Sequence, residues 1–535
     1  MNQSTRNGPI LAGLAMSLGW GIRGDYGHEA GAMLPGALVV LAILLTAGRA
    51  DWLARASTLA MLGAIGWAFG GQMSYGIVIG YTGAATLPDV AYGFAALFLI
   101  GALWGGVGAG ILATGLTWPR ERLESFVHPL SVIGGLWLLL DWTMLTSRLE
   151  DRWAFHDTDW VAATSALLVG AAFYLYGRRW RQPGRLIMVL AAGWWLGYGL
   201  LTLTFGLRMT PPRSDNWAGC LGLFVALYLY LWREGNRAAL LLIAYGLIAG
   251  GAGFAIGDFV QMLGRAGWGP IGRYSALQQL DYWKWMEQLF GLIMGLGIAF
   301  GVRRLLGEGL APVESAPPGR QLRGFALAIL LIVMPWKNFV TNVRVWIERG
   351  QLSEHLLGVG PRGWILIIAV MLTAIMVMAI CRHLKGALPL VPVDPFGRAQ
   401  LLMLLLAWLF VVGDFTRVVS QLQSKGVLAV HVGFWLTALL MTLLVIRLHA
   451  SAPCNLESGQ SRDAADPGWR AGRRLLVVLL LVPLLIFGLA KLTLATHTEP
   501  LPGSHQRFAP DASPEATGTS YRPQSTLFTL SGSKP

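Results

Sequence analysis

The segment GWGIRGDYGHEAGAM, residues 19–33, places Arg23, Asp25, His28 and Glu29 within seven residues. Apolar sequence precedes and follows it, PILAGLAMSL on one side and AMLPGALVVLAILL on the other. Charged side chains inside or beside a membrane are costly and mark pathways, proton relays or binding sites. Histidine titrates near physiological pH. We therefore expect Asp25, His28 and Glu29 to carry coupling protons and Arg23 to contact a solute.

The local structure of this segment has two alternatives. If it is helical, Asp25 and Glu29 share a face at spacing i, i+4, with His28 beside them. The glycines of such a helix would form an adjoining stripe for close packing: Gly21, Gly24, Gly27 and Gly31. If it is instead a polar turn between two membrane helices, the charges pair with one another at the interface.

Further polar side chains lie within or at the ends of apolar runs, toward one end of the predicted bundle. With Arg23, the candidate substrate-binding residues are Gln72, Asp258, Lys284, Glu287, Lys337, Asp414 and Arg417. Any single pair of opposite charge is equally well explained by structural neutralisation. Helix packing alone, however, does not require the whole set of polar residues to gather at one end of the bundle. We therefore expect a polar cavity open toward the periplasmic side.

The elements that must position these residues are membrane helices. The chain of 535 residues is 55% hydrophobic and 13% charged, against about 25% charged in ordinary soluble domains. Apolar runs long enough to cross a hydrocarbon core of about 30 Å recur along it. They predict an all-α transmembrane bundle of fourteen or fifteen spans, at 8–22, 31–47, 57–80, 90–117, 128–146, 159–177, 186–206, 217–232, 238–260, 284–302, 323–340, 363–381, 399–416, 427–446 and 474–491.

The distribution of charge indicates orientation and not nucleic-acid binding. The formal net charge is +13, but the basic residues lie in short alternate loops between apolar runs. The loop 81–90 of the opposite set has no Lys or Arg. By the positive-inside rule the basic loops face the cytoplasm, which indicates a multi-pass protein of a bacterial-type inner membrane, in contact with membrane lipids.

We expect an N-terminal bundle over 1–302, a cytoplasmic linker over 303–323 and a C-terminal bundle over 324–495. The linker is rich in Pro, Gly and charge. Residues 496–535 are rich in Pro, Ser, Thr and Gly, and are expected to be a disordered tail.

The composition also limits the chemistry. The three cysteines, Cys220, Cys381 and Cys454, show no CxxC or Cys/His spacing, so no disulfide framework, metal site or cofactor is expected. Many of the 23 tryptophans fall at predicted span ends, where they are interpreted as interfacial anchors: Trp20, Trp52, Trp118, Trp153, Trp160, Trp180, Trp217 and Trp232.

These features favour a secondary transporter of a small polar or anionic solute, with coupling to protons as the expected energy source. A weak Gly-Asp-aromatic repeat, at Gly24, Gly257 and Gly413, suits the internal repeats of transporters. The alternative is a membrane-embedded transferase acting on a lipid-linked sugar or acyl substrate, with Asp25 or Glu29 as general base. A scaffold subunit without any site would explain the bundle but not the one-sided charges.

Overall fold

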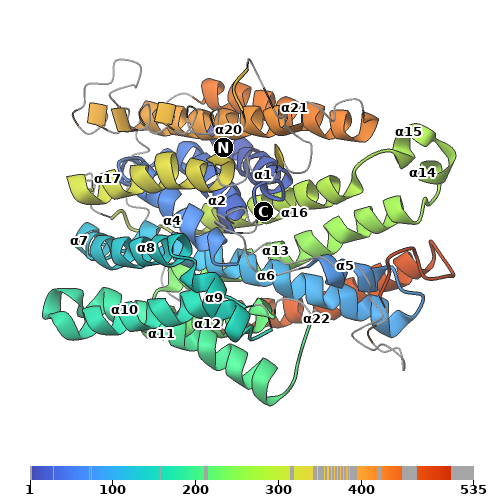
Figure 1. Cartoon of the computed structure of the whole chain (residues 1–535), viewed down its shortest axis with the longest axis horizontal. Coiled ribbons are helices and arrows are strands. Elements are labelled where there is room, and N and C mark those ends of the chain that lie inside the picture. Colours follow the sequence, from blue (N-terminus) through green and yellow to red (C-terminus); the bar gives the residue numbers. More distant parts are fainter. Residues whose placement is uncertain are drawn as a thin grey trace, which may run out of the picture.

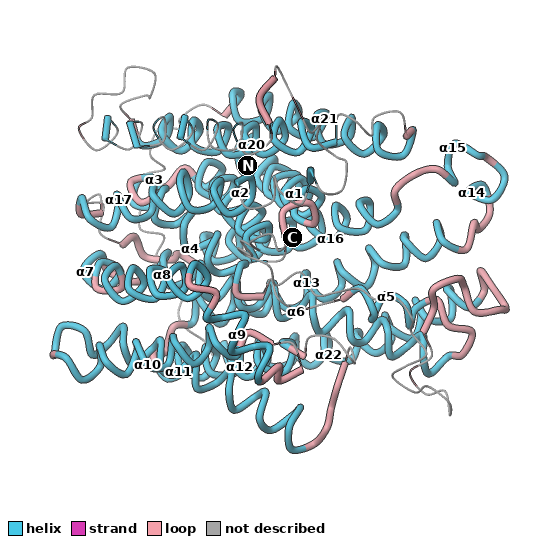
Figure 2. The backbone as a smooth tube through the Cα atoms, viewed as in Figure 1, coloured by secondary structure: helices cyan, strands magenta, loops and turns pink. Residues whose placement is uncertain are grey.

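The structure is a computed structural model that describes residues 3–27, 29–70, 73, 75–156, 158–209, 215–313, 318–340, 346–347, isolated positions between 355 and 385, 394–418, 424–448, 467–505 and 507. The regular elements in these residues are helices, with no strand among them, which confirms the all-helical class. Figure 2 shows the helices running side by side, with most loops at the left and right ends of the bundle.

Nine helical segments in this part of the chain have the length and composition to cross a membrane. They are Glu29–Ala47, Leu87–Thr117, Arg120–Leu140, Arg178–Thr204, Arg237–Arg273, Tyr282–Gly307, Arg320–Phe339, Pro395–Phe415 and Lys425–Arg447. Shorter apolar helices cover Ala56–Ala68, Trp160–Tyr176 and Leu480–Leu494. The total of fourteen or fifteen spans stays a prediction, because most of the span expected at 363–381 lies outside the described residues.

Five long helices form the centre of the bundle (Figure 1). They are α1 (Gln3–Arg23), α2 (Glu29–Ala47), α6 (Leu87–Thr117), α13 (Arg237–Arg265) and α16 (Tyr282–Gly307). Helix α13 packs between α6 and α16, and α1 packs between α16 and α2. At 21 residues, α1 is about 31 Å long, longer than the apolar run of 8–22 that predicted it.

Other helices lie on either side of this centre. In Figure 1, α20 (Pro395–Val418) and α21 (Lys425–Arg447) lie above α2 and α1, which they contact. Helices α10 (Trp160–Tyr176), α11 (Arg181–Tyr198) and α12 (Asn216–Arg233) form a layer at the bottom. The two bundles expected from sequence therefore share an interface.

The remaining helices are short or peripheral. They are α3 (Ala50–Leu53), α4 (Ala56–Ala68), α5 (Gly76–Thr82), α7 (Arg120–Glu124), α8 (Val127–Trp142), α9 (Leu145–Arg152), α14 (Pro270–Arg273), α15 (Ser275–Gln278), α17 (Arg320–Ala328) and α22 (Pro467–Leu494). A 3₁₀ turn covers Arg178–Trp180, and π-helical turns cover Gly199–Thr204, Ile329–Val333 and Trp336–Val340.

The expectation of one continuous helix over 57–80 is wrong. Helix α4 ends at Ala68 and α5 begins at Gly76. At Gly70 the backbone lies directly against Trp104, because a Cβ atom there would be 2.0 Å from that indole. The helix is interrupted beside this contact, and Tyr75 lies at the start of the resumed helix.

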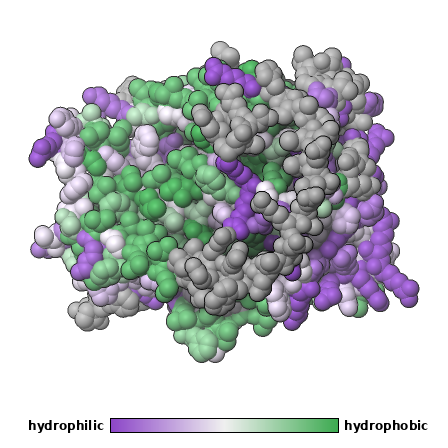
Figure 3. Space-filling view, turned by 180° about the vertical axis from the view of Figure 1, so that it is seen from behind, coloured by the Kyte–Doolittle hydropathy of each residue, from purple (hydrophilic) through white to green (hydrophobic). Residues whose placement is uncertain are grey.

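Much of the molecular surface is apolar. Figure 3 shows one face with a broad hydrophobic area and hydrophilic residues gathered mainly at the left edge and lower right. Leu168, Leu175, Leu196 and Leu484 are each at least 65% exposed. Large exposed apolar areas are rare on soluble monomers, and this surface suits contact with lipid.

The C-terminal region contributes to the fold beyond α22. The tail expected to be disordered begins at 496, and of it residues 496–505 and 507 are described. The backbone N–H of Leu501 donates to the Gly83 carbonyl (3.0 Å), and that of His505 donates to Gly80 (3.1 Å). This segment therefore packs on the end of α5.

Glycine permits the closest contacts between helices. Replacing such a glycine is therefore expected to destabilise the protein. A Cβ atom at Gly291 of α16 would lie 2.4 Å from the Met16 carbonyl oxygen of α1. Gly291→Ala is expected to lower the free energy of unfolding by about 1–3 kcal/mol, because the two helices must move apart. Thermal unfolding of the purified protein measures it. Gly433→Ala in α21 is the control, since nothing lies within 4 Å of its Cβ position; equal losses in both variants would contradict the close contact.

Candidate functional site

A network of charged side chains lies where α1 and α20 end and α2, α16 and α21 begin; we call this the site end of the bundle. At its centre is Asp25, between the two helices of the N-terminal segment. Its Oδ2 lies 2.7 Å from Lys284 Nζ, and its Oδ1 lies 2.7 Å from Arg417 Nη2. The three side chains are only 9–12% exposed. One carboxylate therefore joins cations from α16 and α20.

The turn that presents Asp25 follows from the local sequence. Helix α1 ends at Arg23, and the N–H groups of Asp25 and Tyr26 donate to the carbonyls of Ile22 and Arg23. Gly27 then adopts φ +99°, a conformation that favours glycine. The segment is thus the polar turn, and the helical alternative that put Asp25 and Glu29 on one face is wrong.

A second branch of the network runs through Glu287 and Tyr75. The Tyr75 hydroxyl donates to Glu287 Oε1 (2.5 Å) and accepts from Arg23 Nη1 (2.9 Å). Trp283 Nε1 also donates to Oε1 (3.3 Å), and Glu287 Oε2 lies 3.7 Å from Lys284 Nζ. Tyr75 therefore connects the interrupted helix α4–α5 to the charges of α1 and α16.

Aromatic rings surround Arg23, which is 1% exposed. Its guanidinium carbon lies 5.2 Å from the ring centroids of Trp20 and Trp104 and 5.5 Å from that of Tyr75. Cation–π contacts of this kind stabilise a cation that has lost water. The interpretation of Trp20 as an interfacial anchor is wrong, because it is buried inside the protein. The same correction applies to Trp52, Trp118 and Trp217.

The third branch joins Asp414 to His431. Asp414 Oδ2 lies 2.7 Å from His431 Nε2, and its Oδ1 lies 3.5 Å from Arg417 Nη2. The other ring nitrogen of His431, Nδ1, lies 2.8 Å from the Val427 carbonyl oxygen. Arg417 thus links this pair to Asp25.

The structure brings together six of the residues assigned from sequence: Arg23, Asp25, Lys284, Glu287, Asp414 and Arg417.

The other assigned residues lie outside this network or outside the described part of the chain. Glu29 is half-buried at the start of α2. Lys337 is half-buried and precedes Asn338, whose amide donates to the Ala30 carbonyl (3.0 Å), so it lies near the start of α2. Asp258 lies on another face of α13, described below. His28 and Gln72 lie outside the described residues.

Three residues of the network were not assigned from sequence: Tyr75, Trp283 and His431. Tyr75 and His431 each lie near the end of a predicted apolar run, as the assigned residues do. Trp283 precedes Glu287 by four positions, which places both on one helix face. These signals were present, but position along the chain does not reveal which helix ends are neighbours.

Tyr75→Phe tests the second branch. It removes the hydroxyl that donates to Glu287 and accepts from Arg23, and leaves two buried charged groups short of a partner. We expect the free energy of unfolding to fall by about 1–3 kcal/mol, measured as a lower unfolding temperature in detergent. Tyr228→Phe is the control, because that ring is 37% exposed. If the Tyr75→Phe protein were as stable as the control, the Tyr75 hydroxyl would make no contribution to the stability of the fold.

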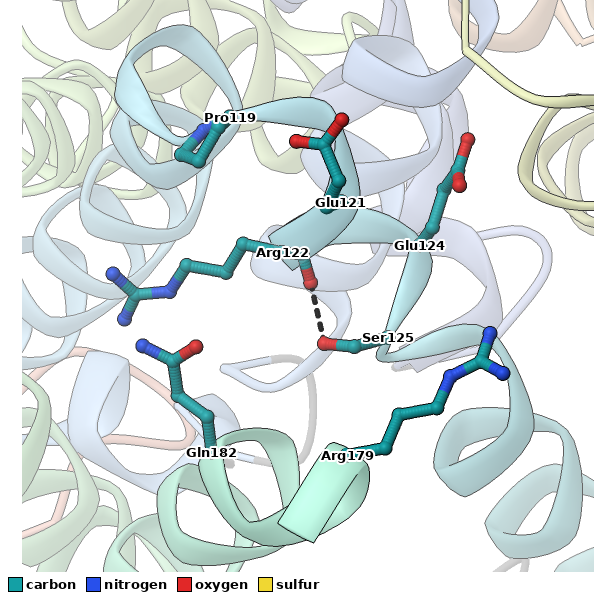
Figure 4. Close-up of a pocket in the computed structure, with 7 residues that line it drawn as sticks. All are labelled: Pro119, Glu121, Arg122, Glu124, Ser125, Arg179 and Gln182. Carbon is teal, nitrogen blue, oxygen red and sulfur yellow. Dashed lines mark hydrogen bonds between the residues drawn. The ribbon is translucent and has the colours of Figure 1, made fainter.

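A surface groove of about 640 Å³ lies elsewhere in the molecule, lined by Pro119, Glu121, Arg122, Glu124, Ser125, Arg179 and Gln182. Figure 4 shows these side chains spread around an open space, with the Ser125 hydroxyl donating to the Arg122 carbonyl. Arg122 pairs with Glu234, and Glu124 pairs with Arg120. The groove lies near the end of α6 opposite its start at Leu87, and shares no residue with the charged network.

A scan against protein-family models finds no matching family, and searches of curated proteins and of solved structures find no similar chain.

Proposed function

We propose that the protein is a secondary transporter of a bacterial-type inner membrane that moves a small polar or anionic solute. The observation that carries the proposal is the position of Asp25, between Lys284 of α16 and Arg417 of α20. These helices belong to the N-terminal and C-terminal bundles, respectively. Asp25 therefore connects the two bundles through a single carboxylate.

An anionic solute has the chemistry to exchange with Asp25. Lysine and arginine both form strong charge-assisted hydrogen bonds to carboxylate and phosphate oxygens. A solute carboxylate or phosphate between Lys284 and Arg417 would release Asp25 and change the contact between the bundles. Relative movement of two bundles around a central site is how many secondary transporters alternate access.

Two further features support this reading. Helix interruptions beside the substrate are common in transporters, and the α4–α5 interruption places Tyr75 in contact with Glu287. The basic loops lie at the opposite end of the predicted spans, so the positive-inside rule would put the site end on the periplasmic side.

Proton coupling is proposed for the Asp414–His431 pair, in addition to Asp25, His28 and Glu29. The Val427 carbonyl can only accept, so Nδ1 of His431 carries a proton. Nε2 lies 2.7 Å from Asp414 Oδ2, the distance of an ion pair, and we propose that a second proton binds reversibly at this pair. The pair can release this proton when the charge on Arg417 becomes available to Asp414.

The proposed substrate class is tested with purified protein in detergent and a panel of small carboxylates, phosphate esters and neutral sugars. At least one anion is expected to raise the unfolding temperature, because a ligand that binds only the folded state stabilises it. Lys284→Met should abolish this rise. Lys491→Met, which removes an exposed lysine near the end of α22, should keep it. No response to any anion, or an unchanged response in Lys284→Met, would refute the assignment.

A further inference from the structure

A second buried carboxylate lies outside the charged network. Asp258 of α13 is 0% exposed, and neither of its carboxylate oxygens has a hydrogen-bond partner among the residues that the structure describes. The neighbouring Gly257 faces α16, since a Cβ atom there would lie 2.7 Å from the Met286 carbonyl. Asp258 instead lies beside Thr82, at the end of α5.

Neutral groups with oxygen atoms lie beside Asp258, one turn further along α13, and on the neighbouring helix α22. The hydroxyl of Thr82 donates its proton to the Ile79 carbonyl (2.7 Å), which leaves it as an acceptor toward Asp258. The amide oxygen of Gln261, one helical turn along α13, is buried and has no hydrogen-bond partner. Unpaired oxygens of this kind are rare inside proteins and call for a partner that donates or is positively charged.

Helix α22 supplies the third group, Thr493. It is 0% exposed, and within the described part of the chain its hydroxyl has no hydrogen-bond partner. It lies one turn beyond Leu489 and Ala490, which pack in one apolar cluster with Ala255 of α13. Ala255 likewise precedes Asp258 by one turn. Asp258 on α13 and Thr493 on α22 therefore each lie one turn beyond residues of the same apolar cluster.

Arg265 does not complete the site. Its guanidinium donates to the carbonyls of Ile79 (3.4 Å) and Pro502 (2.9 Å). Its charge acts on Asp258, but among the described residues no hydrogen bond joins the two side chains. The segment containing Pro502 also packs on the end of α5, through the backbone hydrogen bonds of Leu501 and His505. A carboxylate removed from water without a partner is costly.

We propose that Asp258, Thr82, Gln261 and Thr493 form a binding site for a monovalent alkali cation. All four offer oxygen atoms, which hard cations prefer over nitrogen or sulfur. One carboxylate balances a single positive charge, which disfavours a divalent ion. Consistently, the part of the chain that the structure describes contains no group of three or more His, Cys, Asp or Glu side chains placed to hold a metal ion.

The test compares the unfolding temperature of the purified protein in lithium, sodium, potassium and choline chloride at equal ionic strength. At least one alkali cation is expected to raise it by several degrees over choline and to do so saturably, as binding to the folded state requires. Asp258→Asn should unfold at the same temperature in all four salts. Asp89→Asn should keep the cation response, because Asp89 is a buried carboxylate that already accepts a hydrogen bond from Thr86 (2.5 Å).

The alternative is that Asp258 is simply protonated. In that case the wild-type protein would respond equally to choline and to every alkali cation, and the proposal would be overturned. A cation response that persists in Asp258→Asn would overturn it as well. If Asp258→Asn does not fold, Gln261→Leu decides the question: the half-maximal cation concentration should rise, and an unchanged value excludes this site. None of these outcomes depends on transport.

Discussion

Asp25→Asn is expected to lower the free energy of unfolding by about 3–5 kcal/mol, the usual cost of removing one partner from a buried ion pair. The variant leaves Lys284 and Arg417, each no more than 12% exposed, without their shared anion. Glu287 and Asp414 offset only part of this loss, since they lie 3.7 Å and 3.5 Å from the two cations. Thermal and denaturant unfolding in detergent measure the change.

Two further variants show whether the cause is charge. Arg304→Ala removes an exposed pair with Glu308 on α16, and should change stability by less than about 1 kcal/mol. Asp25→Asn combined with Lys284→Met should recover part of the loss, because one uncompensated cation is removed. If Asp25→Asn were as stable as the wild type, Asp25 would not hold the two bundles together.

The same variant bears on the proposed transport site. If a solute anion takes the place of Asp25, then removing the Asp25 charge removes its competitor. The anion that stabilises the wild-type protein should therefore stabilise Asp25→Asn by a larger number of degrees and at lower concentration. An anion response that disappears in Asp25→Asn would instead make Asp25 part of the recognition surface.

Much of the fold could be predicted because hydropathy and helix length are local properties. The runs predicted at 90–117 and 427–446 correspond to helices Leu87–Thr117 and Lys425–Arg447. Average hydropathy over the run 57–80 did not predict the interruption between α4 and α5, although the Gly-Gly pair at 70–71 is typical of a turn. Gly70 at this interruption lies against Trp104, a contact between residues far apart in the chain.

The candidate site was predictable only in part, for a related reason. The position of a charge along its span indicates the end of the bundle at which it lies, and this places Asp25 and Lys284 at one end although 259 positions separate them. It does not indicate which way the side chain faces. Asp258 lies toward the same end, but Gly257 occupies the face against α16, so Asp258 contacts α5 instead.

The second large effect is expected for His431→Gln, in proteoliposomes loaded with the anion that stabilises the purified protein. Uptake driven by an imposed pH gradient should be abolished, whereas exchange of the solute across the membrane should continue. Glutamine can still donate and accept hydrogen bonds, but it cannot gain and lose a proton beside Asp414 as histidine can. His497→Gln is the control, because His497 also has a hydrogen-bonded ring nitrogen, facing the Ala84 carbonyl, but lies outside the network.

The pattern of losses distinguishes the proposed transporter from its alternatives, and Glu29→Gln can be compared in the same assays. If Glu29 also carries protons, its variant should lose uptake and keep exchange, as His431→Gln does. A transferase that used either residue as a general base would lose turnover by about 10²–10⁴-fold with or without a gradient. A purely structural His431 would show a lower unfolding temperature together with parallel losses of uptake and exchange. Normal gradient-driven uptake by His431→Gln would remove the Asp414–His431 pair from coupling, because a site that cannot exchange its proton cannot transmit the gradient.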